Sequence, residues 1–202
     1  MTREIKFRVY ILDKSGKVEC YFHEWLDGDG WKHDYYWPLV TNGVFIHEEL
    51  GDGFLGKIVR TQFAGLNDKS GKEIYEGDAI RIRRPYRTTQ THYGDNIPNG
   101  SYTEPMEPGI KTEEFIVVVR DSCFCVINED SNDCQALSWL NIKWDLDHIR
   151  DAISFGRPER FVWDEPEEGD LQYLISECAK VKTAEELIEY LSGIEVIGNI
   201  RS

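Results

Sequence analysis

The chain has 202 residues, a formal net charge of −14, 41% hydrophobic residues and 12% aromatic residues. This length and composition exclude a largely disordered protein and predict a globular chain with one substantial core and room for a second small domain. The negative charge opposes binding to nucleic acids and to anionic membranes, because like charges repel. We therefore expect no nucleic-acid partner and no membrane association.

The distribution of charge and cysteine indicates a cellular compartment. No apolar run reaches the about 18 residues of a membrane-spanning helix. The first stretch, MTREIKFRVYILDKSG, carries charges throughout, unlike a secretory signal. Five cysteines without regular spacing are typical of a reducing compartment rather than of a disulfide framework. We expect a cytoplasmic protein.

The N-terminal region predicts a β-hairpin. Residues 4–12 alternate apolar and polar side chains, which is typical of a strand with one buried face. Asp13 to Lys17 then supplies a glycine turn, and Val18 to Leu26 is the expected return strand.

An aromatic and acidic segment follows at residues 27–38. Its spacing lacks the sixth-position glycine and the closing glutamate of an EF-hand, so we expect no calcium site. We interpret the segment as a surface loop whose aromatic rings partly pack on the sheet. If the rings were exposed together, they would instead form a contact surface for a partner or for self-association. These candidate protein-contact residues are Trp31, Tyr35, Tyr36 and Trp37.

The middle of the chain predicts further strands. The segment FAGLNDKSGKEIYEGDAIRI, residues 63–82, contains two polar glycine turns and then an alternating strand. Residues 114–120 and 123–128 predict a hairpin around Asp121-Ser122, with the first strand central because both of its faces are apolar. Between them, residues 85–112 contain several prolines and glycines and predict a long loop suited to a specific interaction. This order is similar to that of a small SH3-like barrel.

The C-terminal region changes character. Asp164 to Glu189 contains nine acidic residues and two lysines. Leu171 to Cys178 follow helical spacing, and a second helix is expected to begin at Thr183 as N-cap and to end at Gly193. A closing strand should follow. The fold class expected is α+β, mainly β: an N-terminal hairpin, an SH3-like barrel core and a helical insertion before the last strand. The expected divisions are residues 1–62, 63–163 and 164–202, or one compact domain over 4–200.

Three segments carry a family resemblance. REIKFRVYILDKSGK near the start, FAGLNDKSGKEIYEGDAI in the middle and IEVIGNI near the end resemble, in this order, signature segments of the YopX family of phage and prophage proteins. Phe63-Ala64 departs from the Tyr-Thr that is more common in that family. The resemblance implies a β-rich fold, a phage or prophage origin in a bacterial host cell, and no established biochemical activity.

One basic cluster lies in the run RIRRPYR. Arginines with neighbouring tyrosines can bind nucleic-acid backbones and stack on bases. Alternating arginines can also solvate an edge strand and pair with acids, an interpretation that the net charge favours. The candidate nucleic-acid residues are Arg81, Arg83, Arg84 and Arg87, with Tyr86 and Tyr93 nearby.

Two other clusters could carry chemistry. Cys123, Cys125 and Cys134 lack the ligand spacing of a structural zinc site, so we interpret them as buried core residues. A helix at residues 144–153 would bring His148 and its neighbouring aspartates to one face, as in an acid–base pair or a metal site. Local ion pairs on an exposed helix are the favoured interpretation.

No phosphate-loop, dinucleotide, zinc-protease or nucleophile-elbow motif occurs in the sequence. We therefore expect a non-enzymatic accessory protein without cofactor or metal, which acts through an unidentified protein partner or as a homo-oligomer. The alternatives are a nucleic-acid-associated module, an acidic DNA mimic that blocks a host DNA-binding protein, and a hydrolase using Asp147 and His148.

Overall fold

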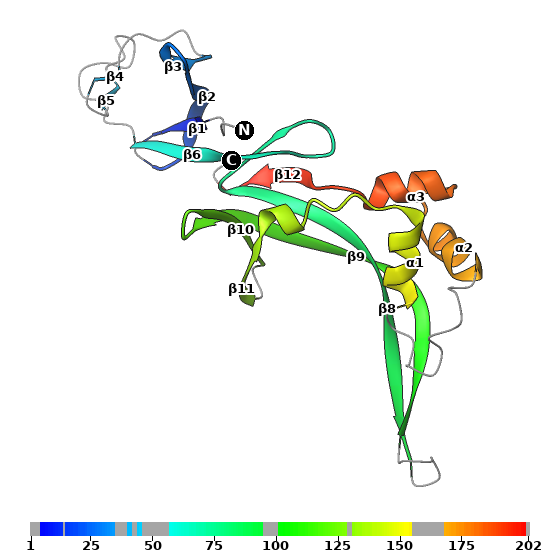
Figure 1. Ribbon diagram of the computed structural model, residues 1–202. Helices are drawn as coiled ribbons and strands as arrows, with labels where there is room; N and C mark the ends of the chain where they lie inside the picture. The colour runs from blue at the N-terminus through cyan, green and yellow to red at the C-terminus, as the bar shows by residue number, and fades with distance from the viewer. Residues whose placement is uncertain are drawn as a thin grey trace. The chain divides into compact units, whose positions relative to one another are not determined.

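The structure is a computed structural model, in which the chain is mainly β with three α-helices toward the C-terminal end of the described part (Figure 1). Its description covers residues 5–13, 15–34, 40–41, 44–45, 57–94, 101–128, 131–154 and 168–200. The chain forms two compact units. Unit 1 comprises residues 1–80, 114–139 and 195–202, and unit 2 comprises residues 81–113 and 140–194. Each unit combines segments distant in the sequence, whereas the expected divisions followed chain order.

The first sheet of unit 1 has the order β3-β2-β1-β6-β7. The predicted N-terminal hairpin is confirmed, since β1 pairs antiparallel with β2. Val9, Ile11 and Phe22 form its buried cluster. Because β1 lies in the middle of the sheet, its residues 8–12 are buried without alternation. The strands are β1 Ile5–Leu12, β2 Val18–Asp27, β3 Gly30–His33, β6 Lys57–Asn67 and β7 Glu73–Tyr75, and a separate pair is β4 Val40–Thr41 with β5 Val44–Phe45.

The second sheet has the order β11-β10-β9-β8-β12. The predicted hairpin at Asp121 and Ser122 is confirmed, and both residues adopt the positive φ of a tight turn. The expected barrel is wrong for the described strands, because they form two open five-stranded sheets and the separate β4–β5 pair. The SH3-like strand order stays a prediction. The strands are β8 Asp78–Tyr93, β9 Ser101–Arg120, β10 Cys123–Asn128, β11 Ser131–Ala136 and β12 Glu195–Asn199, and a short 3₁₀ helix, η2, spans Leu137–Trp139.

The expected long loop at residues 85–112 is mostly strand. Residues 85–93 belong to β8 and residues 101–112 to β9, and residues 95–100 lie outside the described part. From residue 86 onward β8 has no buried residue. No apolar side chain of β8 is buried beyond residue 85, and the period-2 signal of a half-buried strand is therefore missing from this part of its sequence.

Unit 2 packs its helices around one apolar cluster. Figure 1 shows α1, α2 and α3 gathered beside the β8–β9 hairpin. The predicted capping is confirmed, since the Thr183 hydroxyl accepts a hydrogen bond from the Glu186 amide, and Gly193 follows the helix with φ of 76°. The helices are α1 Leu146–Ser154, α2 Glu168–Glu177 and α3 Ala184–Leu191, and the buried cluster is Ile149, Ile153, Leu171, Leu174, Ile175, Val181, Leu187 and Leu191.

The predicted closing strand is confirmed as β12, which lies beside β8. The sequence also predicts a short strand at Phe161 and Trp163, and these two residues lie outside the described part of the chain. No helix in the described part of the chain is both long enough and apolar enough to cross a membrane.

Candidate functional site

A buried charge pair lies in unit 1, at the turn between β7 and β8. Asp78 is 1% exposed and lies 2.7 Å from Nη1 of Arg8. Its carboxylate also accepts hydrogen bonds from the Tyr75 amide and the Asn199 side chain. The Arg8 guanidinium stacks over the Tyr75 ring at 4.1 Å. Both carboxylate oxygens of Asp78 thus accept hydrogen bonds from other residues of unit 1. We therefore interpret this network as structural, since it connects β1, β8 and β12.

Two identical turns support the same unit. The pentapeptide DKSGK occurs at residues 13–17 and 68–72. In each turn the aspartate Oδ1 accepts from the serine amide at 2.8 Å, from the serine hydroxyl at 2.6 Å and from the second lysine amide at 2.9 Å. Only at Asp68 does the second oxygen also accept from a distant backbone amide, that of Val196, at 3.2 Å. The local sequence builds the turn, and the tertiary contact distinguishes the two copies.

The arginine cluster is largely paired inside unit 2. Arg83 is 9% exposed, and its guanidinium lies 4.5 Å from the centre of the Tyr190 ring. Arg87 Nη2 lies 2.5 Å from Asp170, although its N–H is not aligned with that oxygen, and Arg84 Nε lies 3.6 Å from Glu113. Arg81 is partly exposed and also has an interaction partner. These contacts leave little uncompensated positive charge for nucleic-acid phosphates.

The predicted aromatic surface is only partly described. Trp31 lies on β3, is 59% exposed and has its ring centre 5.9 Å from that of Phe7. Tyr35, Tyr36 and Trp37 lie outside the described residues. The structure therefore shows one exposed tryptophan at this place and does not test a joint patch.

The cysteine interpretation needs correction. Cys123 and Cys134 are exposed and Cys125 is half-buried, so they are not core residues. Cys134 pairs with Ile127 across β10 and β11, and this register turns all three thiols toward one face. The alternation of side chains along a strand places these cysteines on one face, but it does not tell whether that face is buried or exposed to solvent. A hydrogen bond with Cys134, followed by burial, raises the pKa of the Cys125 thiol.

The aspartate and histidine cluster lies at the start of α1, as expected. The His148 Nδ1 lies 2.9 Å from Asp145, and both side chains are well exposed. Arg150 pairs with Asp147 at 3.5 Å. Among the residues that the structure describes, no group of three or more histidine, cysteine or acidic side chains is placed to hold a metal ion.

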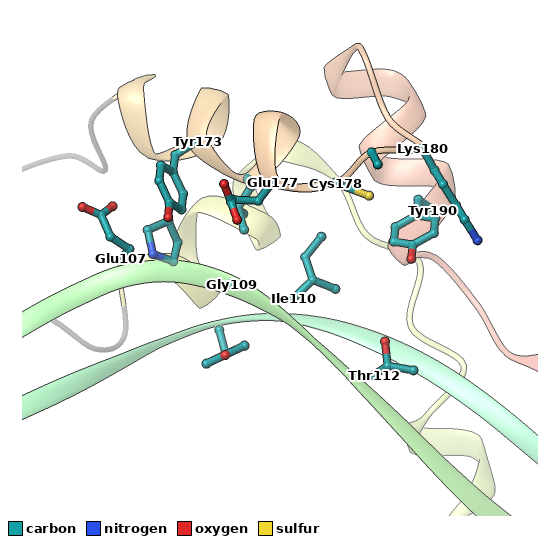
Figure 2. A pocket seen from close by; sticks show the side chains of 13 residues that line it. Glu107, Gly109, Ile110, Thr112, Tyr173, Glu177, Cys178, Lys180 and Tyr190 are labelled. Carbon is teal, nitrogen blue, oxygen red and sulfur yellow. The ribbon is translucent and has the colours of Figure 1, made fainter.

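A pocket in unit 2 is the strongest candidate site. It has a volume of about 560 Å³ and lies between the β8–β9 hairpin and helices α2 and α3 (Figure 2). Ile110 and Leu174 supply apolar walls, and three tyrosines add aromatic surface. The lining residues that carry polar or aromatic groups are Tyr86, Glu107, Thr112, Tyr173, Glu177, Cys178, Lys180 and Tyr190.

The pocket is electrostatically uneven. Figure 2 shows Glu107, Tyr173 and Glu177 toward one end and Tyr190 and Lys180 toward the other. The charge of Glu177, loss of hydration and the charge of Glu107 together raise the pKa of the Tyr173 phenol. Both carboxylates therefore act on one small region, which makes this end of the pocket acidic.

Sequence reasoning missed the pocket. Its walls come from strand residues expected to be a loop and from two helices whose mutual packing has no local signature. One signal was present at Gly109, where a Cβ atom would lie 2.9 Å from the Tyr86 ring. In the sequence this signal is only a glycine that follows Pro108. It indicates that a side chain lies close to the backbone only once the pairing of β8 with β9 is known.

Comparison with known proteins identifies the family. The model of the YopX protein family matches residues 39–145. No curated protein and no solved structure matches the chain. Since the family match spans more than half of the 202 residues, the chain belongs to the YopX family.

Proposed function

We propose that this YopX protein is a non-enzymatic accessory protein of a phage or prophage, and that it binds another protein through the pocket of unit 2. The observation that carries the proposal is the composition of this pocket. It joins apolar walls to three tyrosines and a few charged groups, which is the composition of protein contact sites with aromatic anchors. The contacts of Arg83, Arg84 and Arg87 inside unit 2 favour a protein partner over a nucleic acid.

A matched pair of variants tests the proposal. Tyr86 lines the pocket and is 41% exposed, so Tyr86→Ala should fold while removing one aromatic wall. Trp139→Ala removes a larger exposed ring from unit 1 and serves as the control. We expect a host protein to be captured from lysate by the wild type and by Trp139→Ala, and to be lost with Tyr86→Ala.

Two results would contradict the proposal. Capture that is unchanged in Tyr86→Ala would place the contact elsewhere, and recovery of DNA alone would support the nucleic-acid alternative. If the pocket binds a second copy of this chain, light scattering should show a dimer for the wild type and a monomer for Tyr86→Ala. That result would identify the protein partner as the chain itself.

A further inference from the structure

We infer that the acidic end of the unit 2 pocket receives a lysine or arginine side chain from the partner protein. The inference rests on the proposed function and names the chemistry of the group that is bound. Its basis is the placement of two carboxylates, of tyrosine rings and of an apolar wall around one cavity.

The two carboxylates at this end of the pocket are those of Glu107 and Glu177. In the described part of the chain, no ion pair joins Glu107 or Glu177 to a lysine, arginine or histidine. Two other acids near this hairpin do have cations, since Glu113 contacts Arg84 and Lys111, and Asp170 contacts Arg87. Glu107 and Glu177 thus keep negative charge that no cation in the described part of the chain pairs with, and an incoming cation would supply that partner.

The tyrosines suit a cation with an aliphatic stem. A guanidinium or ammonium group is attracted to an aromatic face, and Arg83 already makes such a contact with Tyr190 in this unit. Ile110 and Leu174 lie along the same cavity and can cover the methylene groups of a long side chain. The pocket's own cation, Lys180, lies at the Tyr190 end, away from Glu107 (Figure 2).

Size and charge argue against other occupants. A cavity of about 560 Å³ is larger than one side chain and leaves room for the neighbouring residue of a peptide. Phosphate groups would meet the repulsion of Glu107 and Glu177, so a nucleotide does not suit this end. A free polyamine shares the cationic chemistry, and the experiment must therefore separate it from a protein segment.

Fluorescence polarisation with the full chain provides the test. The probes are labelled octapeptides with a central Lys-Leu or Arg-Leu pair, the same peptides with norleucine or glutamate in place of the cation, and unlabelled spermidine as competitor. We expect the cationic peptides to bind at least about tenfold more tightly than the norleucine peptide, as for a hydrogen bond to a charged group. Added salt should weaken the binding.

The variants Glu107→Gln and Glu177→Gln should each weaken the binding of the cationic peptides and leave that of the norleucine peptide unchanged. Glu189→Gln removes an equal charge from an exposed position on α3 that does not line the pocket, and it should bind like the wild type. Circular dichroism checks that each variant is folded.

Three outcomes would overturn the inference. In the first, the norleucine peptide binds as tightly as the cationic peptides. In the second, the cationic peptides bind both pocket variants as tightly as they bind the wild type. In the third, spermidine binds to the protein and none of the peptides does. A host protein that is lost with Tyr86→Ala while the peptides show no cation preference would leave the proposed function standing and reject the cationic group.

Discussion

Nη1 of Arg8 lies 2.7 Å from Oδ1 of Asp78, and the two residues are 70 positions apart in the chain. The contact ties the first strand to the turn that opens β8. Burial alone would lower the pKa of Arg8, but the hydrogen bond to Tyr10 and the charge and hydrogen bond of Asp78 raise it above its ordinary value. The guanidinium is therefore held in its charged form inside unit 1.

Removing one member of this pair should be strongly destabilising. Arg8→Met leaves the nearly inaccessible Asp78 carboxylate without its cation, and the expected loss of unfolding free energy is about 3–5 kcal/mol. Asp78→Asn should also destabilise the fold, and the double variant should lose less than the sum of the two single losses. Urea denaturation of the four proteins measures this coupling, and strictly additive losses would contradict a direct interaction.

The two identical turns predict unequal effects of the same substitution. Asp68→Ala removes the local hydrogen bonds and also leaves the Val196 amide without its carboxylate, with an expected loss of about 1–3 kcal/mol. Asp13→Ala removes the same local bonds from an exposed turn and should cost less, because water replaces them. Denaturation midpoints compare the variants directly. Equal losses would show that the Val196 contact contributes nothing.

Acid should weaken unit 1 through Asp68 and Glu73. Burial acts to raise the pKa of Asp68, but hydrogen bonds from Ser70, Val196 and Lys72 lower it below its ordinary value. Hydrogen bonds from Lys6 and Tyr75 likewise overcome burial and lower the pKa of Glu73. A pKa lowered by folding stabilises the fold fully above the ordinary value, about pH 4, and this stabilisation is lost as the pH falls through the folded-state pKa.

We therefore expect the unfolding free energy to fall as the pH decreases below about 4, and to fall less steeply in Asp68→Asn. Asp151→Asn, on the exposed side of α1, is the control and should retain the wild-type slope. An unchanged slope in Asp68→Asn would show that this carboxylate does not titrate with folding.

The three thiols on β10 and β11 should react at different rates. Cys125 hydrogen bonds with Cys134, which raises its pKa, and it is less exposed than Cys123. Because the thiolate is the nucleophile, iodoacetamide at pH 8 should alkylate Cys125 more slowly than Cys123. Cys134→Ala should accelerate the reaction of Cys125. Peptide mass spectrometry over time measures both rates, and equal rates in the wild type would contradict the predicted order.

Local structure was largely predictable from the sequence. The hairpin of β1 and β2, the turn at Asp121 and Ser122, and the capped helix α3 all depend on residues within a few positions of one another. Their signals are alternation, glycine or short polar turn residues, and the spacing of Thr183 and Glu186. Such signals act over the same short range as the hydrogen bonds that they form.

The pocket could not be predicted in this way. Tyr86 and Gly109 face each other across two strands, while Tyr173 and Tyr190 come from two helices far along the chain. The part of β8 that carries Tyr86 has no apolar period, and none of its residues from 86 to 93 is fully buried. Without that strand pairing, nothing in the sequence places these side chains around one cavity.

The two DKSGK turns distinguish what the local sequence determines from what the tertiary structure determines. The pentapeptide by itself determined the turn, since its aspartate, serine and glycine satisfy the same hydrogen bonds at both places. Only the tertiary structure decided that Asp13 stays partly exposed while Asp68 is buried and its carboxylate accepts a hydrogen bond from the Val196 amide of β12. The physical reason is range: backbone geometry is set by neighbouring residues, whereas burial and charge pairing depend on segments that meet only in the folded protein.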